Sequence, residues 1–191
     1  MNWLFALLYR LAGWSSLGHV PKELKKAIWI VAPHWNSRDF FIGIGIRATI
    51  GIKIGFLAKN TLFKWYSGWF FRGLGGFPVN RSRSNQLVDA VAETFRQNDF
   101  IHIAIAPEGT RSNVSRLKTG FYFMALKAQV PIVPVGFDHT RKCVVFGEVI
   151  YPTGDYLKDM KPIYDFYTTI QSPKKEWLQN YEQAGTIALP K

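Results

Sequence analysis

Short apolar runs alternate along the chain with longer segments in which apolar residues recur every three or four positions. The short runs are typical of buried strands, and the periodic segments are typical of helices with one apolar face. Strands are predicted at residues 29–32, 54–58, 75–81, 101–106 and 132–137, helices at residues 62–71, 84–98, 121–128, 163–171 and 174–184, and a strand pair around Gly147 at residues 142–151. Alternation at these lengths favours βαβ units. We therefore expect a single α/β domain with a central, mainly parallel sheet flanked by helices.

The first 14 residues place Trp3, Leu4, Leu7, Leu8 and Leu11 at helical spacing. This segment is too short to cross a bilayer, which needs about 20 apolar residues, and it lacks the basic leader of a secretory signal. A helix lying in the membrane surface fits the pattern, and so does a helix packed on the protein's own core. We expect a membrane-surface helix over residues 1–20 and one domain over residues 21–191. No other apolar run reaches spanning length without a charge, so any membrane association should be peripheral.

The composition adds a strong positive charge, since 24 lysines and arginines against 13 acidic residues give +11. This charge indicates an anionic partner, such as a phosphate-bearing small molecule, an acidic lipid surface or nucleic acid. Aromatic residues make up 16% of the chain, and the seven tryptophans favour a lipid interface, although aromatic rings also stack on bases. Cys143 is the single cysteine, which excludes an internal disulfide and a CxxC metal site.

Residues 40–88 contain no acidic residue but seven lysines and arginines, with aromatic rings threaded among them. A basic, aromatic surface is attracted to anionic lipid and buries its rings among the headgroups. Alternatively, the rings are ordinary core residues and the cations form a solvated rim. We expect Trp65, Trp69 and Phe70 to belong to a surface for the acyl chain or the membrane.

His34 is the first candidate for chemistry, because it follows the apolar run at residues 29–32 and precedes Asp39 by five positions. On one continuous helix these two side chains would point apart. A strand–turn–helix junction, favoured by Pro33, would let Asp39 bend back from the first turn of a helix. A carboxylate on one imidazole nitrogen leaves the other nitrogen as a base. Alternatively, His34 is a surface residue and Asp39 a helix cap, and the two never touch.

Two further turns carry charged residues after predicted strands. Arg81 closes the strand at residues 75–81, and Glu108 follows the strand at residues 101–106. Ligands of open parallel sheets bind beyond the carboxyl ends of the strands, so we expect these turns to lie at one edge of the sheet with His34. Arg81, Arg111 and Lys118 have the charge to hold a phosphate there, which an arginine can do with two parallel hydrogen bonds.

The turn at residues 107–112 reads PEGTRS. Gly109 has no side chain and allows a ligand to approach closely, while Thr110 and Ser112 offer hydroxyls. The alternative is a turn stapled by a local ion pair between Glu108 and Arg111.

Four ordered motifs carry a resemblance to a known family. His34-x4-Asp39 is the first, and the others are GFPVNR at residues 76–81, PEGTRS at residues 107–112 and VPIVP at residues 130–134. They are similar to the motif blocks of the glycerolipid acyltransferases, the superfamily of 1-acylglycerol-3-phosphate (lysophosphatidate) acyltransferases. The similarity extends to residues 58–63 and 118–125 and spans residues 28–137. The family usually has Asn before the histidine and Ser two places after it, whereas this chain has Pro33 and Asn36, as in a small bacterial subgroup.

The resemblance implies the fold of the glycerol-phosphate acyltransferases and a role in phospholipid biosynthesis. A fatty acyl group would move from acyl-CoA or acyl carrier protein to a hydroxyl of lysophosphatidate or a related lyso-glycerolipid. His34 would be the general base and Asp39 would orient it, with no metal or other cofactor. The implied location is peripheral, at the cytoplasmic face of the bacterial inner membrane. The implied substrate-binding residues are Arg81 for the acceptor phosphate, Glu108 and Gly109 for the glycerol hydroxyls, and Arg111 and Lys118 for further phosphate or oxyanion contacts, with Thr110 beside them and the aromatic tract for the acyl chain.

Other functions stay open on the sequence alone. The acceptor could be glycerol phosphate or another lyso-lipid, and a non-catalytic membrane-binding module would keep the basic aromatic surface without a His34–Asp39 pair. A nucleic-acid-binding protein would explain the charge, but the sequence contains no recognisable nucleic-acid-binding module, so no nucleic-acid partner is expected. The expected partners are an anionic membrane surface, a lysophospholipid and an acyl thioester, with acyl carrier protein as one of two donors. Of the other histidines, His102 is expected in the core and His19 and His139 at the surface.

Overall fold

The computed structural model describes residues 2–59, 61, 63–79 and 84–190. Its strands form one seven-stranded sheet in the order β1-β7-β6-β2-β5-β3-β4. All neighbouring strands run parallel except β6 and β7, which run antiparallel. The strands are β1 (Ser15–Leu17), β2 (Lys26–Ala32), β3 (Ile54–Lys59), β4 (Gly76–Val79), β5 (Ile101–Ile105), β6 (Ile132–Asp138) and β7 (Cys143–Phe146). The mainly parallel sheet predicted from the sequence is therefore confirmed.

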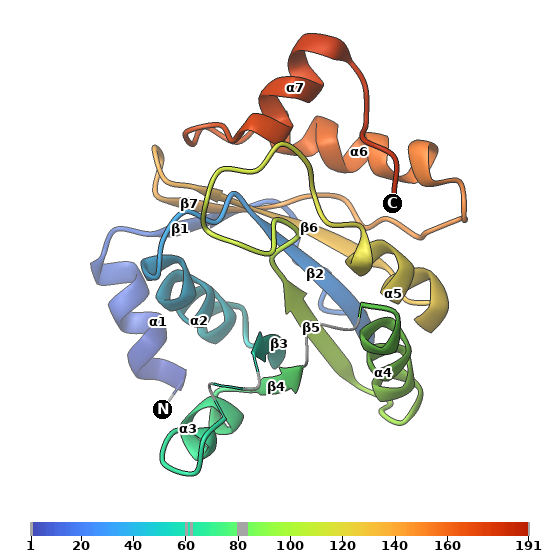
Figure 1. Cartoon of the computed structure of the whole chain (residues 1–191). Helices are drawn as coiled ribbons and strands as arrows, with labels where there is room; N and C mark the ends of the chain where they lie inside the picture. The colour runs from blue at the N-terminus through green and yellow to red at the C-terminus, as the bar shows by residue number, and fades with distance from the viewer. Residues whose placement is uncertain (1, 60, 62, 80–83, 191) are drawn as a thin grey trace.

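Helices cover both faces of the sheet (Figure 1). They are α1 (Asn2–Leu11), α2 (Arg38–Ile50), α3 (Gly68–Gly73), α4 (Ser84–Arg96), α5 (Gly120–Ala128), α6 (Tyr156–Thr168) and α7 (Glu176–Ala184). On one face, Tyr9 of α1 and Ile46 of α2 share a core with Trp29 of β2. On the other face, residues of α4, α5, α6 and α7 share a larger core with Ile28 and Ile30. Successive residues of β2 thus point into opposite layers, as strand geometry requires.

Strand β2 lies between β5 and β6, and its Ile30 is opposite Ile105 of β5 and Pro134 of β6. Because these three strands are parallel, their carboxyl ends meet at one edge of the sheet. The loops that leave this edge, at residues 33–37, 106–119 and 139–142, are therefore neighbours in space although they lie far apart in the sequence.

The helix predicted at residues 62–71 is wrong in its first part, because α3 begins only at Gly68. Residues 65–67 form a turn, closed by hydrogen bonds from the amides of Ser67 and Gly68 to the carbonyl oxygen of Lys64. Gly68 lies so close to Phe63 that a Cβ at this position would come within 3.1 Å of the Phe63 carbonyl oxygen. The chain folds back on itself here, and the spacing of apolar residues does not predict such a turn.

The strand pair predicted around Gly147 is also wrong. Phe146 pairs with Val135 of β6, and Ile150 forms an isolated bridge with Ile132 of the same strand. The residues on both sides of Gly147 therefore follow one neighbour, β6, and do not form a hairpin with each other.

Helix α6 begins at Tyr156, well before the predicted start at residue 163. Asp155 caps it by accepting a hydrogen bond from the amide of Lys158. Pro162 lies inside the helix, and because proline lacks the amide hydrogen of a helical residue, the sequence predicted a helix only after it. The strands and helices predicted at residues 29–32, 54–58, 84–98, 101–106, 121–128, 132–137 and 174–184 are found within a few residues of their predicted ends. The strand predicted at residues 75–81 is found as β4, and its last two residues lie outside the described part of the chain.

Helix α1 packs on α2 through Tyr9, which is buried, and a Cβ on Gly45 of α2 would come within 2.7 Å of that tyrosine side chain. The other side of α1 is open. Trp3 is 70% exposed and Leu11 is 74% exposed. The five apolar residues that predicted a membrane-surface helix are thus left uncovered, whereas Tyr9 accounts for the packing on the core.

The turn before α3 and α3 itself also present aromatic rings to solvent. Trp65 is 92% exposed and Trp69 is 71% exposed, and Tyr66 and Phe70 are exposed beside them. The alternative in which these rings belong to the core is therefore excluded for these four. Within the described part of the chain, no helix is both long enough and apolar enough to cross a membrane.

Candidate active site

His34 and Asp39 meet across the junction between β2 and α2. Nδ1 of His34 lies 2.9 Å from Oδ2 of Asp39, which is buried in the first turn of α2. The peptide bond between Ala32 and Pro33, just before the histidine, is cis. The His34 side chain remains 21% exposed, and Nε2 is the ring nitrogen left for a substrate. The predicted contact is present, and the alternative in which these side chains never touch is excluded.

The loop between them supplies further hydrogen bonds to Asp39. Oδ2 accepts from the amide of Trp35 at 2.7 Å and from the amide of Asn36 at 3.0 Å. Burial alone would raise the pKa of Asp39, but the hydrogen bonds from His34 and from the two amides outweigh burial and hold this pKa below its ordinary value. Asp39 is therefore a carboxylate at neutral pH, able to fix the tautomer and orientation of the imidazole.

Glu108, in the loop after β5, is enclosed by the protein and holds the backbone of His34. Its Oε2 accepts hydrogen bonds from the His34 amide at 2.9 Å and from Nζ of Lys175 at 2.7 Å. Its Oε1 accepts from the indole N–H of Trp177 at 3.2 Å. The structure does not support the expected contact between Glu108 and substrate hydroxyls, because both oxygens are bonded within the protein and the side chain has no exposed surface. The ion-pair partner of Glu108 is Lys175, not the neighbouring Arg111.

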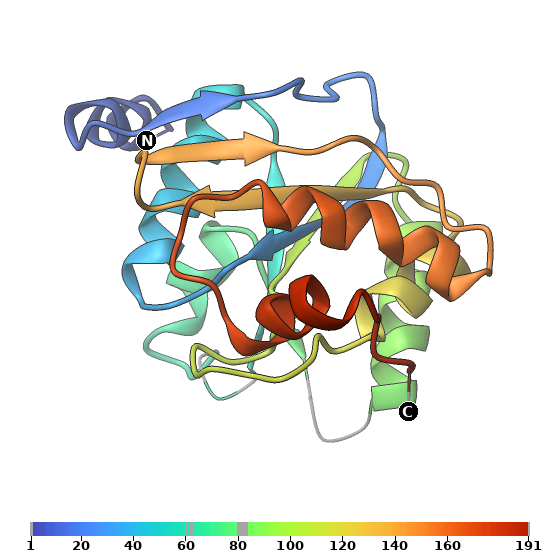
Figure 2. The same ribbon diagram turned by 90° about the horizontal axis from the view of Figure 1, so that it is seen from above.

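The C-terminal segment packs against both the loop after β2 and the loop after β5. The carbonyl oxygen of Pro173 accepts a hydrogen bond from the indole N–H of Trp35 at 3.1 Å. At the start of α7, the amide of Glu176 donates to Oδ1 of Asn113 at 2.9 Å. Figure 2 shows this loop, residues 106–119 in yellow-green, running beside α7. Helix α7 therefore fixes the loop that carries Glu108.

Gly109, Arg111 and Lys118 lie in this loop, as the sequence predicted. The neighbour of Gly109, however, is the side chain of Lys118 and not an open space for a ligand. Gly109 has a φ of +67°, a conformation that favours glycine. The space left by its missing side chain is taken by Lys118, whose Cε would come within 2.7 Å of a Cβ on Gly109. Arg111 and Lys118 are both exposed, so their cationic groups are accessible to an anionic ligand. Their contact with a substrate phosphate stays a prediction.

Thr110 is exposed, and its Oγ1 accepts a hydrogen bond from the amide of Ser112 at 3.2 Å. Its predicted substrate contact is therefore sterically open but untested. Arg81, the predicted ligand of the acceptor phosphate, lies outside the described residues.

His139, which follows β6, is a further side chain at this edge, and the expectation that it is an ordinary surface residue is wrong. Its Nε2 lies 3.3 Å from Oδ1 of Asp39, and its ring packs edge-on against Trp14 with the ring centroids 5.6 Å apart. Its amide donates to Oγ of Ser172 at 2.7 Å. The preceding residue, Asp138, is buried, and its Oδ2 accepts hydrogen bonds from Nε of Arg141 and from the amide of Gln171.

The remaining histidines lie where the sequence predicted. His102 is buried and accepts a hydrogen bond from the indole N–H of Trp29 at 3.1 Å, and His19 is exposed beside Glu23. Across the described ranges, no group of three or more His, Cys, Asp or Glu side chains is arranged to hold a metal ion.

A family model described as Acyltransferase matches residues 18–138, well over half of the chain. The chain belongs to this family. The matched region contains His34, Asp39 and the loop with Glu108. The resemblance based on the four motifs is therefore confirmed.

Curated relatives of this acyltransferase chain share its motif-bearing part. The chain is 30% identical over 129 residues to the 1-acyl-sn-glycerol-3-phosphate acyltransferase of Saccharomyces cerevisiae, a match that covers 63% of the chain and 41% of the relative. It is also 30% identical over 120 residues to the protein of the same name from Salmonella typhimurium, covering 60% of the chain and 48% of the relative. The chain thus spans less than half the length of the curated relatives it matches.

The fold is shared with a solved structure from the same group of proteins. The crystal structure of the 1-acyl-sn-glycerophosphate (LPA) acyltransferase PlsC from Thermotoga maritima matches with a TM-score of 0.60 and 18% sequence identity. The match covers 91% of this chain and 78% of PlsC. At this identity the match shows the fold alone, which is the acyltransferase fold expected from the motifs.

Two features of the candidate site were missed by reasoning from the sequence. Lys175 and Trp177 lie beyond the matched region, in a part of the chain without a recognisable motif. His139 was expected to be an ordinary surface residue, and its contact with Asp39 was not predicted. The position of His139 two residues after the strand predicted at residues 132–137 was an available signal, since residues that follow the strands of a parallel sheet lie at the ligand-binding edge.

Proposed function

We propose that the chain transfers a fatty acyl group from acyl-CoA or acyl carrier protein to a hydroxyl of lysophosphatidate or a related lyso-glycerolipid. The observation that carries the proposal is the 2.9 Å contact between Nδ1 of His34 and Oδ2 of Asp39 in a member of the acyltransferase family. The names of the curated relatives support lysophosphatidate as the first acceptor to test. This reaction belongs to phospholipid biosynthesis.

In the proposed reaction, Nε2 of His34 removes the proton of the acceptor hydroxyl. The acceptor oxygen attacks the thioester carbonyl carbon, forms the C–O bond of the new ester, and displaces the thiolate as the C–S bond breaks. The imidazolium then returns its proton to the thiolate, so His34 ends neutral and no acyl-enzyme forms. Asp39 holds Nδ1 throughout and stabilises the imidazolium.

The charges at this edge support a phosphate-bearing acceptor. Arg111 and Lys118 are exposed on the loop after β5, the strand that pairs with β2, and Arg81 completes the proposed phosphate site by analogy with the family motif. An arginine can bind a phosphate with two parallel hydrogen bonds, while a lysine acts as a point charge. The chain's own residues and the two substrates suffice for this mechanism, and no resident cofactor takes part in it.

The proposed reaction takes place at an anionic membrane surface, the cytoplasmic face of the bacterial inner membrane. The net charge of +11 and the exposed rings of Trp3, Trp65 and Trp69 support this placement. Such rings partition into the headgroup region, where an acyl chain would also enter the site.

The experiment that tests the function measures acyl transfer from labelled long-chain acyl-CoA and acyl carrier protein to a panel of acceptors. The panel contains lysophosphatidate, glycerol phosphate and other lyso-lipids, and wild type is compared with His34→Ala after both are shown to be folded. His19→Ala is the matched control, because His19 is an exposed histidine paired with Glu23, away from Asp39. We expect turnover that prefers lysophosphatidate, needs His34 and tolerates His19→Ala.

Other outcomes point to the alternatives. Preference for glycerol phosphate or another lyso-lipid would keep the mechanism and change the acceptor. Wild-type turnover in His34→Ala would show that the mechanism is wrong. A folded wild type that acylates none of the acceptors would make the non-catalytic membrane-binding module the better proposal.

A further inference from the structure

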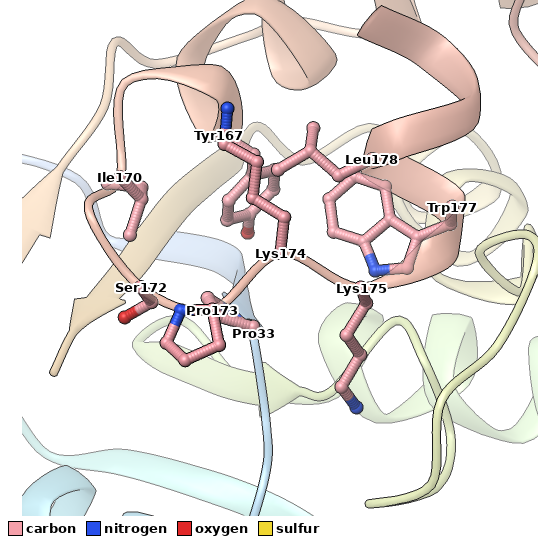
Figure 3. A pocket seen from close by; sticks show the side chains of 9 residues that line it. All are labelled: Pro33, Tyr167, Ile170, Ser172, Pro173, Lys174, Lys175, Trp177 and Leu178. Atoms are coloured by element: carbon pink, nitrogen blue, oxygen red, sulfur yellow. The ribbon is translucent and has the colours of Figure 1, made fainter. Parts of the chain in front are cut away.

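Lys175 is a buried lysine that the transfer mechanism does not use. Its side chain has no exposed surface, whereas the preceding Lys174 is exposed and forms an ion pair with Glu182 of α7. Figure 3 shows the two lysine side chains leaving the segment in opposite directions. Lysine is almost never fully buried unless it is paired, so this position has a specific set of partners.

The partners of Lys175 converge on the candidate base. Its Nζ donates to Oε2 of Glu108 at 2.7 Å, to the carbonyl oxygen of His34 at 2.7 Å, and to the carbonyl oxygen of Ser112 at 3.1 Å. An ammonium group has three protons, and these three oxygens satisfy them. The side chain therefore ties one loop to the other through the backbone of the histidine itself.

The Lys175–Glu108 ion pair holds both peptide groups that flank the α-carbon of His34. Glu108 accepts from the His34 amide, and Lys175 donates to the His34 carbonyl oxygen. The ammonium also lies 4.9 Å from the centre of the Trp35 ring, a cation–π distance, and the Trp35 amide in turn donates to Asp39. The amide and the carbonyl oxygen of His34 are thus both held by side chains outside its own loop.

Lys175 does not have the surroundings of a substrate ligand. The cavity beside it, lined by Pro33, Tyr167, Ile170, residues 172–175, Trp177 and Leu178, has a volume of about 10 Å³ (Figure 3). Such a space holds at most about one water molecule. Any contribution of Lys175 to acyl transfer must therefore act through the residues that it holds.

We propose that Lys175, with Glu108, is a positioning residue of the acyl transfer, which fixes the His34 imidazole by holding the peptide groups on both sides of it. This inference rests on the proposed function, in which His34 is the base. A displacement of about 1 Å of a reacting group can cost about 10²-fold in rate, so a loosened His34 should lower turnover without weakening substrate binding.

The test uses the full chain and three substitutions. Lys175→Met removes the ammonium but keeps much of the side-chain volume. Lys174→Met is the matched control, because it removes the same charge from the adjacent, exposed position. Tyr122→Phe controls for lost stability, because it removes the buried hydrogen bond from Tyr122 to Asp159, which lies on α6 away from His34.

We expect Lys175→Met to lower kcat by about 10²-fold while KM for the thioester and for the acceptor stays within about threefold. Lys174→Met and Tyr122→Phe should keep kcat near that of wild type. A folded Lys175→Met with wild-type kcat would overturn the proposal. An equal loss in Tyr122→Phe at equal loss of stability would also overturn it, because the effect would then be general loosening.

A second readout does not depend on turnover. With ¹⁵N-labelled histidine, NMR should show a single His34 tautomer protonated at Nδ1 in wild type and a mixture or broadened signals in Lys175→Met, with the His102 signals unchanged. If wild type acylates no acceptor, the proposed function fails while this spectrum still tests the positioning. Unchanged His34 signals in Lys175→Met would overturn it.

Lys175→Met leaves Glu108 as an unpaired buried charge and could for that reason fail to fold. The double variant Lys175→Met/Glu108→Gln then carries both measurements, because it leaves no unpaired charge and its glutamine can still accept from the His34 amide. The same loss of kcat and of the single tautomer is expected. Wild-type values in the double variant, or its failure to fold, would assign the pair to the core alone and overturn the proposal.

Discussion

Nε2 of His139 lies 3.3 Å from Oδ1 of Asp39, on the carboxylate oxygen that His34 does not contact. The distance is that of an ion pair, but the geometry is not that of a hydrogen bond, so neither atom has a hydrogen-bonding partner within the described chain. Asp39 thus lies between two imidazoles and is hydrogen-bonded through one oxygen only. His34 contacts Asp39 through Nδ1 and so leaves its Nε2 away from the carboxylate. His139 contacts Asp39 through Nε2 and so leaves its Nδ1 away from it.

His139→Ala should lower kcat for acyl transfer by less than about tenfold, since the contact between His34 and Asp39 does not depend on His139. His34→Ala should lower it by about 10²–10⁴-fold, the usual contribution of a general base. Steady-state rates at saturating thioester and acceptor, on variants with unchanged circular dichroism, check this. Equal losses in the two variants would contradict the assignment of His34 as the sole base.

Asp39→Asn should change how stability depends on pH. The pKa of Asp39 is lowered in the folded chain, so its ionised form stabilises the fold. This stabilisation is complete above the ordinary aspartate pKa of the unfolded chain, about 3.9, and is lost as the pH falls through the lower pKa of the folded state. Urea unfolding should therefore give a larger free energy of unfolding for wild type than for Asp39→Asn at neutral pH. The difference should shrink below about pH 4, and a difference that stays constant with pH would contradict the linkage.

Glu108→Ala should destabilise the fold by about 3–5 kcal/mol, because it leaves the buried ammonium of Lys175 without its counter-charge. The matched control is Thr110→Ala in the same loop, where the side chain is exposed and the change should stay within about 0.5 kcal/mol. Chemical denaturation at neutral pH gives both values. Equal stability of Glu108→Ala and wild type would show that solvent reaches Lys175.

Trp65→Ser and Trp69→Ser should each weaken binding to vesicles of anionic phospholipid by about tenfold, since each removes a large exposed ring. The matched control is Phe100→Ser, because Phe100 is 73% exposed but precedes β5, at the edge of the sheet away from the site. Vesicle flotation measures the binding, which should also weaken as salt rises.

Binding as tight as that of wild type in both tryptophan variants would move the membrane contact elsewhere on the chain. Tight binding to duplex DNA without flotation would instead overturn the membrane proposal, because binding to nucleic acid would then explain the positive net charge.

The parts of the fold that were predictable are those determined over a few residues. His34 and Asp39 lie in one strand–turn–helix junction, so their contact needs only local geometry. The buried strands at residues 101–106 and 132–137 are short apolar runs with clear ends, and their parallel pairing follows from the helices between them. The resemblance then supplied the reaction, which local geometry could not.

Lys174 and Lys175 show why the rest could not be predicted. They are identical neighbours in the sequence, yet one is paired with Glu182 at the surface and the other is enclosed beside Glu108. Which of them enters the site depends on where α7 docks, and the contact partners of Lys175 lie 67 and 141 positions away. The spacing of apolar residues within a helix or strand does not predict such a contact. The same holds for the folded-back turn at Gly68.

The family match ends at residue 138, whereas the carbonyl oxygen of His34 is held by Lys175, beyond that boundary. A chain emerging from the ribosome therefore carries all four motifs before it can form the contact between Lys175 and His34, the proposed base. Helix α7, which begins directly after Lys175, can therefore pack on the loop after β5 only after all four motifs have been synthesised. If Lys175 positions His34 as proposed, a protease cut between α6 and α7 should lower acyl transfer without removing any residue of the four motifs.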